Sequence, residues 1–163
     1  MRTLVVLRHA KSDWSGGEPD MLRPLGKRGL HQAPVAGQWL AATLDRIDLA
    51  VVSPAQRALA TWDLASADLP SRPRLVIEDR MYAASGRQLL EVVRGLPDEE
   101  GTVALVGHNP GLEELVELLT GEWVPMPTSA LALVELTGPW AAAGPASGTL
   151  RASGRPPMGT GRP

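Results

Sequence analysis

Near its start the sequence contains four consecutive apolar residues, Leu4-Val5-Val6-Leu7, and Arg8 and His9 follow them directly. A short unbroken apolar run is typical of a strand that is covered on both faces, as in a parallel sheet. Similar runs follow at residues 49–52, 75–77, 103–106 and 130–136. Because helical patterns alternate with these runs, the sequence predicts an α/β fold. This is a three-layer sandwich in which a mostly parallel central sheet of about five strands is flanked by helices.

Three of the helices are predicted from signals at their ends. Ser53-Pro54-Ala55-Gln56 combines a capping serine, a proline in the first turn and a glutamine three residues after the cap. Ser85-Gly86-Arg87-Gln88 has the same cap and glutamine spacing, and Gly95 is expected to end that helix. Asn109-Pro110 is expected to open another helix, with Asn109 as its cap, and Gly121 to end it.

The length of 163 residues is that of one domain, which we expect to span residues 1–140. Residues 141–163 are rich in Gly and Pro and poor in large apolar side chains, which predicts a flexible C-terminal tail. The chain has no cysteine, which excludes disulfides, a thiolate zinc site and a cysteine nucleophile.

The formal net charge of −2 argues against a nucleic-acid partner. No apolar run is long enough to span a membrane, and no signal-peptide pattern precedes the first predicted strand. We therefore expect a cytoplasmic protein that binds neither nucleic acid nor membrane. No feature of the sequence specifies an oligomeric state.

Polar residues follow the predicted strands at the points where these end. Arg8-His9 follows the first strand, Ser53 and then Arg57 the second, Glu78-Asp79 the third and His108-Asn109 the fourth. In open α/β sheets, ligands bind at the carboxyl ends of the strands. We therefore expect two histidines, two arginines and two carboxylates to meet at one edge of the sheet.

This set of side chains favours a phosphorylated ligand. The planar guanidinium group of arginine binds two phosphate oxygens at once, and helix N-termini at the same edge add positive potential. Neighbouring arginines lower the pKa of a histidine, and a neutral imidazole that faces a phosphoryl group is a nucleophile. A metal site is the rival interpretation, but arginines repel a cation. The Gly-x-Ser-x-Gly and P-loop patterns are both missing from the sequence.

An ordered set of motifs resembles one known family over residues 1–136. The matching segments are Leu7–Trp14, Asp20, Arg23–Leu25, Arg28-Gly29, Ser53–Ala58, Thr61, Asp79–Tyr82, Val106–Gly111 and Pro127-Thr128. Together they resemble the histidine phosphatase (phosphoglycerate-mutase-like) superfamily and, within it, the small SixA-like phosphohistidine phosphatases. Ala10 replaces a glycine that much of the superfamily has, but the SixA-like branch commonly carries alanine there.

The resemblance implies a role for each residue at the strand ends. His9 would attack phosphorus and become a phosphohistidine, which water then hydrolyses. Arg8 and Arg57 would hold the phosphoryl oxygens, and His108 would be a further phosphate contact. Asp79 would be the proton donor to the leaving group. This chemistry implies neither a metal nor a cofactor.

Two residue assignments and the substrate stay open at this stage. Glu78 is the alternative proton donor, and Arg23 either contacts the substrate or pairs with Asp20. The expected substrate is a phosphohistidine protein or a small phosphorylated molecule. A phosphoglycerate-mutase-like phosphotransferase is an alternative that the short chain disfavours. A non-catalytic phosphoprotein-binding module is another alternative. It conflicts with the presence of all four central residues of the expected site, which are Arg8, His9, Arg57 and His108.

Overall fold

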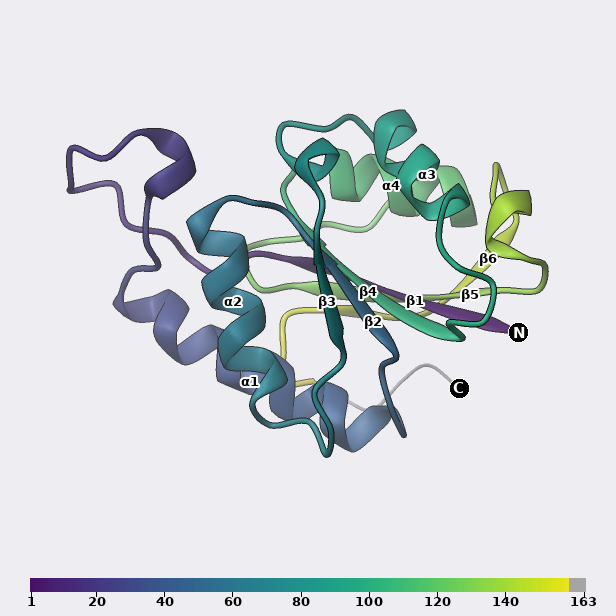
Figure 1. Cartoon of the computed structure of the whole chain (residues 1–163), viewed down its shortest axis with the longest axis horizontal. Coiled ribbons are helices and arrows are strands. Elements are labelled where there is room, and N and C mark those ends of the chain that lie inside the picture. Colours follow the sequence, from purple (N-terminus) through teal and green to yellow (C-terminus); the bar gives the residue numbers. More distant parts are fainter. Residues whose placement is uncertain (159–163) are drawn as a thin grey trace.

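The computed structural model describes residues 1–158, which form one six-stranded sheet with helices on both faces (Figure 1). The strands are β1 (Arg2–Arg8), β2 (Leu49–Val52), β3 (Arg74–Ile77), β4 (Thr102–Gly107), β5 (Leu131–Leu136) and β6 (Gly148–Gly154). The α-helices are α1 (Lys27–Thr43), α2 (Gln56–Ser66), α3 (Gly86–Arg94) and α4 (Gly111–Thr120). Short 3-10 helices cover Asp20–Leu22 (η1), Asp79–Met81 (η2) and Trp140–Ala142 (η3).

The strand order is β3-β2-β4-β1-β5-β6. The first four strands of this order run parallel, and β5 and β6 are antiparallel to their neighbours. In the register of β1 with β4, Arg8 lies opposite Gly107. The ends of these two central strands, which carry the two predicted site histidines, therefore lie side by side. The predicted α/β fold with a mostly parallel sheet is confirmed.

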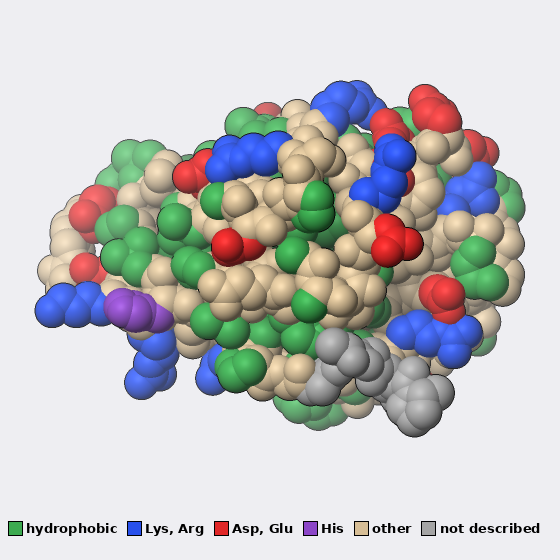
Figure 2. Space-filling view, turned by 90° about the horizontal axis from the view of Figure 1, so that it is seen from below, with side chains coloured by type: hydrophobic (Ala, Val, Ile, Leu, Met, Phe, Trp, Pro, Cys, Tyr) green, Lys and Arg blue, Asp and Glu red, His purple; other side chains and the backbone are tan. Residues whose placement is uncertain are grey.

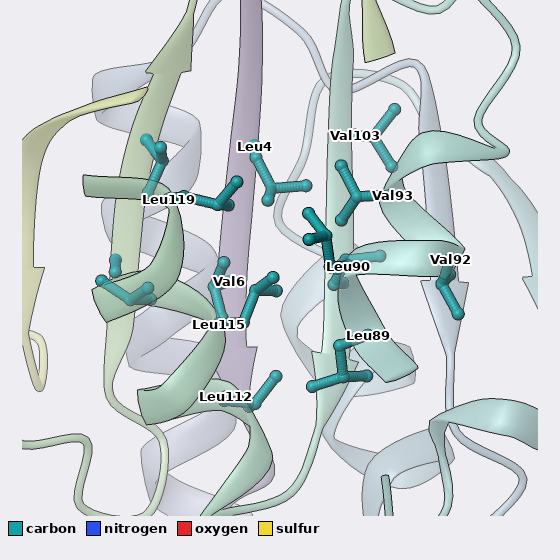
Figure 3. Packing of buried hydrophobic residues seen from close by; sticks show 14 of the residues in the cluster. Leu4, Val6, Leu89, Leu90, Val92, Val93, Val103, Leu112, Leu115 and Leu119 are labelled. Carbon is teal, nitrogen blue, oxygen red and sulfur yellow. The ribbon is translucent and has the colours of Figure 1, made fainter. Parts of the chain in front are cut away.

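Alternate residues of the central strands face two separate apolar layers. Leu4 and Val6 of β1 pack under α3 and α4 in one layer, as Figure 3 shows. Val5 and Leu7 of the same strand belong to the other layer, with residues of α1 and α2 such as Leu40. Each fully buried leucine contributes roughly 1.5–3 kcal/mol, so both layers hold the central strands firmly. Burial on both faces explains the unbroken apolar runs of the sequence.

The third apolar run behaves differently from the others. Residues 74–77 form β3, but Leu75 and Ile77 are 49% and 53% exposed. The expectation that this strand is buried is wrong, because β3 is an outermost strand that pairs only with β2. An apolar run indicates a strand but does not indicate its place in the sheet order.

The predicted tail is also wrong for much of its length. Residues 148–154 form β6, which pairs with β5 and brings the sheet to six strands, and η3 buries Trp140 completely. Strand pairing uses backbone hydrogen bonds, so a segment poor in large apolar side chains can still join a sheet. The structured domain thus extends beyond residue 140. The last part of the predicted tail, 159–163, lies outside the described residues.

Helix ends match the sequence signals at α3 and at the end of α4. Ser85 and Gln88 form a reciprocal capping box at the start of α3, and Gly95 is the C-cap residue of that helix. Gly121 ends α4 with a left-handed φ of 76°. Within residues 1–158, no helix is long and apolar enough to cross a membrane.

Candidate active site

A pocket of about 280 Å³ lies at the carboxyl ends of β1, β2 and β4. Its lining combines four cationic side chains, one carboxylate, two histidines and several neutral side chains: Arg8, His9, Lys11, Ser12, Trp14, Asp20, Arg23, Arg57, His108, Asn109 and Thr128. A larger hollow of about 660 Å³ beside α3 and α4 is lined without a histidine. The predicted meeting of histidines and arginines at one sheet edge is therefore present in the structure.

His9 is held in one tautomer at the end of β1. Its backbone N–H donates to the Gly107 carbonyl (3.1 Å), and its ring lies 5.2 Å from the His108 ring between centroids. His9 Nδ1 lies 2.8 Å from the Ala10 carbonyl oxygen. A carbonyl oxygen only accepts hydrogen bonds, so Nδ1 carries the proton and Nε2 keeps a free lone pair.

Both pocket histidines are neutral at neutral pH. Burial lowers the pKa of His9 to about 3; the hydrogen bond to the Ala10 carbonyl opposes this shift, and the positive charges of Arg57 and Arg8 add to it. Burial likewise lowers the pKa of His108 to about 4, with Arg57 as the next cause. His9 therefore has an unprotonated ring nitrogen in a strongly cationic pocket, as nucleophilic attack requires.

Arg8 and Arg57 each have a hydrogen-bonding group without a partner. Arg57, in the first turn of α2, donates from Nη1 to the Asp20 carbonyl (2.7 Å) and from Nη2 to the Asp20 carboxylate (3.1 Å). Arg8 donates from Nη1 to the Met126 carbonyl (3.2 Å). Among the described residues, no acceptor reaches the buried Nε–H of either arginine. A buried donor left unpaired costs about 1–3 kcal/mol, so these groups favour a ligand with acceptor oxygens.

Asp20 organises the arginines from η1. Its carboxylate accepts hydrogen bonds from Arg23 Nε (3.0 Å), from Arg57 Nη2 and from the Tyr82 hydroxyl. The Tyr82 bond and then the two arginines hold the pKa of this carboxyl well below its usual range. Asp20 is therefore ionised and poorly suited to donate a proton.

Arg23 forms the pair with Asp20 that was one of its two predicted roles, and substrate contact stays a prediction. It pairs with Asp20, and it also lines the pocket with only 7% of its surface exposed. Nη1 donates to Ser12 Oγ (2.7 Å), and Cζ lies 3.4 Å from the centroid of the Trp14 ring. Stacking on an aromatic face orients the planar guanidinium group.

Backbone packing explains how the segment that carries Trp14 and Asp20 reaches the pocket. The Gly26 N–H donates to the Lys11 carbonyl (2.9 Å), which closes residues 11–26 into a loop. A Cβ at Gly29 would lie 2.1 Å from the same carbonyl oxygen, so this close approach requires glycine. The protruding loop is visible at one end of the molecule in Figure 1.

The structure does not bring Asp79 or Glu78 into the pocket. Asp79 is exposed at the start of η2, and the Glu78 side chain accepts hydrogen bonds from the backbone N–H and guanidinium group of Arg80. These residues follow the outermost strand β3, about 10 Å from β4 at the usual strand spacing. Tyr82, further along the chain, does reach the site, with its ring 5.7 Å from that of His108.

Two residues predicted as helix caps, Ser53 and Asn109, form hydrogen bonds in the site instead. α2 begins at Gln56 and α4 at Gly111, and neither has a side-chain cap. Ser53 Oγ instead lies 2.7 Å from His108 Nε2, and Asn109 Nδ2 donates to the Met126 carbonyl (2.7 Å). Their position directly after β2 and β4 was the available signal, because side chains at strand ends face the ligand edge.

Ser53 also influences the tautomer of His108. Its hydroxyl oxygen accepts from the Ala55 N–H (3.2 Å), and donation of the hydroxyl proton to His108 Nε2 gives that proton an acceptor. In this arrangement His108 Nδ1 carries the ring proton. Nδ1 is buried and has no hydrogen-bond partner among the described residues, so an acceptor oxygen of a bound ligand would complete its hydrogen bonding.

The pocket lining carries an excess of positive charge. Four cationic side chains line it together with a single carboxylate, that of Asp20. On the molecular face shown in Figure 2, acidic and basic side chains are interspersed. A concave site with an excess of one charge attracts ligands of the opposite charge, here an anion such as a phosphoryl group.

Sequence comparison gives related proteins over most of the chain. Residues 4–83 match the family model of the histidine phosphatase superfamily (branch 1). An uncharacterized protein of Mycobacterium tuberculosis is 32% identical over 155 residues, which cover 88% of this chain and 96% of that protein. An uncharacterized protein of Mycobacterium leprae is 29% identical over 148 residues, which cover 82% and 89%.

Two solved structures are similar in both fold and sequence, and each is described as a candidate phosphohistidine phosphatase SixA. The protein from Nakamurella multipartitia is 27% identical with a TM-score of 0.84, and the match covers 96% of this chain and 97% of that one. The protein from Agrobacterium tumefaciens is 28% identical with a TM-score of 0.80, and the match covers 95% and 98%. On these matches, this chain belongs to the histidine phosphatase superfamily (branch 1), in its SixA-like branch.

Proposed function

We propose that this chain is a phosphatase in which His9 Nε2 is the nucleophile. The observation that carries the proposal is the hydrogen bond from His9 Nδ1 to the Ala10 carbonyl, which leaves Nε2 unprotonated in a pocket lined by arginines. Membership of the histidine phosphatase superfamily supports phosphatase activity. The match of fold and sequence to two SixA-type structures supports phosphohistidine as the substrate.

The reaction has two displacements at phosphorus. In the first, a bond forms between His9 Nε2 and phosphorus while the bond from phosphorus to the leaving group breaks, which gives a phosphohistidine on the enzyme. In the second, water attacks phosphorus, the bond to Nε2 breaks and inorganic phosphate is released. Arg8, Arg57 and the Nδ1–H of His108 donate to the phosphoryl oxygens in both transition states. The guanidinium groups supply the positive charge that a metal ion would otherwise supply, so the reaction is metal-independent.

The acid groups at the site favour a substrate with a good leaving group. Asp20 is ionised, and Asp79 and Glu78 lie outside the pocket lining. A leaving group that needs little protonation by the enzyme fits this arrangement, and the imidazole of phosphohistidine leaves more easily than an alkoxide. Trp14, on the pocket rim, is 70% exposed and gives a protein substrate an accessible surface. Phosphohistidine in a protein is therefore the preferred substrate, and a small phosphorylated molecule is the alternative.

The test is phosphate release from a phosphohistidine protein and, in parallel, from a phosphate monoester, both in EDTA. Wild type should release phosphate faster from the phosphohistidine protein, and His9→Ala should lose the activity. His31→Ala is the matched control, because His31 is exposed on α1 and bonds only locally, to the Lys27 carbonyl (3.3 Å). Failure of wild type to release phosphate from either substrate, or full activity of His9→Ala, would contradict the proposal.

A further inference from the structure

The C-terminal segment returns to the edge of the sheet where the pocket lies. At the end of β6, Gly154 pairs with Leu131, which in turn pairs with Leu7, two residues before His9. Gly154 has a φ of 137°, a backbone conformation that favours glycine, and the chain continues from it to Arg155. The segment predicted as a tail thus places a cation beside the pocket.

Arg155 is anchored to a turn that is itself bonded to the nucleophile. Arg155 Nε donates to the Thr128 carbonyl (2.8 Å), and Nη2 donates to Thr128 Oγ1 (3.3 Å). Thr128 lines the pocket, and the next residue, Ser129, donates its N–H to the His9 carbonyl (3.0 Å). Two steps of hydrogen bonding therefore fix the Arg155 guanidinium group relative to His9.

The charge of Arg155 is uncompensated at this place. Among the described residues, no carboxylate lies within ion-pair distance of it, whereas other surface arginines such as Arg74 and Arg151 pair with glutamates. Its charge acts on Arg8, whose pKa is lowered by burial and, against the opposing effect of Glu113, by the charge of Arg155. A cation held beside another cation is stabilised when an anion binds between or next to them.

A bound phosphoryl group alone does not neutralise all the positive charge of the pocket lining and Arg155. Arg8, Lys11, Arg23 and Arg57 line the pocket, Asp20 offsets one of their charges, and Glu113 acts on Arg8 from nearby. A phosphoryl dianion then balances the charge of the lining and leaves Arg155 without a counter-charge. Three of the five N–H groups of its guanidinium are unused by the described residues, enough for a bidentate bond to an acid group.

We propose that Arg155 binds a second acidic group of the substrate, a carboxylate or phosphate close to the phosphoryl group that His9 attacks. The inference rests on the proposed phosphatase function and narrows its substrates to those with such a group. In a protein substrate the acidic group is an Asp or Glu next to the phosphorylated residue, and in a small substrate it is a second acid on the same molecule. Arg155 thereby sets specificity and takes no part in the displacement at phosphorus.

The first experiment measures binding without turnover. Phenylphosphonate is compared with its 2-, 3- and 4-carboxy derivatives by titration calorimetry, with wild type, Arg155→Ala and Arg151→Ala. Arg151 lies on β6 in an ion pair with Glu135, so its loss removes the same charge from the same segment. For the best carboxylated isomer, wild type should bind about tenfold more tightly than it binds phenylphosphonate, as expected for one charge-assisted contact. Arg155→Ala should lose this preference and Arg151→Ala should keep it.

The second experiment identifies the source of the acidic group. Phosphohistidine peptides with Asp or Asn beside the phosphorylated residue are compared with carboxyphenyl phosphates and phenyl phosphate. If the substrate is a protein, wild type should have a lower KM for the Asp peptide than for the Asn peptide, with nearly the same kcat, and Arg155→Ala should lose this difference. If the substrate is a small molecule, the Arg155-dependent difference in KM should appear only between the carboxyphenyl phosphates and phenyl phosphate.

If Arg155→Ala weakens binding and turnover equally for the charged and the neutral compound of every pair, the inference is overturned and the phosphatase function stands. The same holds if wild type has no preference for a carboxylate in binding. Absence of turnover with intact carboxylate-dependent binding contradicts the phosphatase function and leaves the inference standing.

Discussion

Replacing Ser53 by alanine tests how the structure sets the state of His108. Ser53 is completely buried, and its hydroxyl bridges His108 Nε2 (2.7 Å) and the Ala55 N–H (3.2 Å). In Ser53→Ala both partners lose this bond. A buried polar group without a partner costs about 1–3 kcal/mol, and water from the adjacent pocket offsets part of the loss at His108. We therefore expect the free energy of unfolding to fall by about 1–2 kcal/mol.

The effect on catalysis should exceed what this loss of stability explains. Without the Ser53 proton on Nε2, His108 no longer keeps its proton on Nδ1, and the pocket loses one N–H donor to the phosphoryl oxygens. A hydrogen bond to a charged group contributes about 1.5–3 kcal/mol, which corresponds to roughly a tenfold to hundredfold lower kcat. Substrate still binds Arg8 and Arg57, so KM should change less.

The assay combines kinetics with the tautomer itself. Phosphate release gives kcat and KM, urea unfolding gives stability, and 15N chemical shifts of the His108 ring report which nitrogen carries the proton. Ser66→Ala is the matched control, because Ser66 is also buried but its hydroxyl makes only a long bond to the Asp63 carbonyl (3.4 Å) on α2. A kcat for Ser53→Ala within twofold of that for Ser66→Ala, or an unchanged His108 tautomer, would show that Ser53 does not set the protonation of His108.

Two further predictions concern the pH profile and the loop of residues 11–26. Because burial lowers the pKa of His9 to about 3, His9 stays neutral and kcat/KM should not fall through pH 6.5 as it would for an ordinary histidine; a pH–rate profile that declines with a midpoint near 6.5 would contradict this. Below pH 6.5 the histidines of the unfolded chain take up protons and buried His9 does not, so the free energy of unfolding decreases as the pH falls. Circular dichroism at each pH therefore checks that the protein is still folded. Gly29→Ala places a Cβ 2.1 Å from the Lys11 carbonyl, so it should lower the free energy of unfolding by about 1–3 kcal/mol and reduce kcat/KM. Gly17→Ala, which lies within the loop itself, meets no atom within 4 Å and should change the free energy of unfolding by less than about 0.5 kcal/mol in the same urea titration. Equal effects of the two variants would show that the close approach of Gly29 to the Lys11 carbonyl does not limit stability.

The central part of the site was predictable because its causes are local. Four apolar residues before Arg8 and His9 indicate a buried strand, and the same pattern precedes His108. Parallel strands place their carboxyl ends at one edge of a sheet, so residues far apart in sequence meet there without further information. The capping box of Ser85 and the stop at Gly121 were predictable for the same reason, since each depends on a few neighbouring residues.

The location of the predicted proton donors relative to the pocket depends on strand order. Asp79 and Glu78 do follow a strand, but that strand lies at the outside of the sheet, two places from β4. An apolar run does not encode which neighbours a strand has. The loop that brings Asp20 to Arg57 is similarly non-local, since the contact joins residues 37 positions apart.

Local sequence patterns predict the fold class, the edge of the sheet that carries the site, and its two histidines and main arginines. These follow from apolar periodicity and from residue chemistry at strand ends, both of which are local. Two features required the folded chain: Ser53 binds His108 rather than capping a helix, and Arg155 stands beside the pocket. Such features depend on the direction of single hydrogen bonds between distant segments. Packing of the whole chain sets these directions, and no short stretch of sequence contains them.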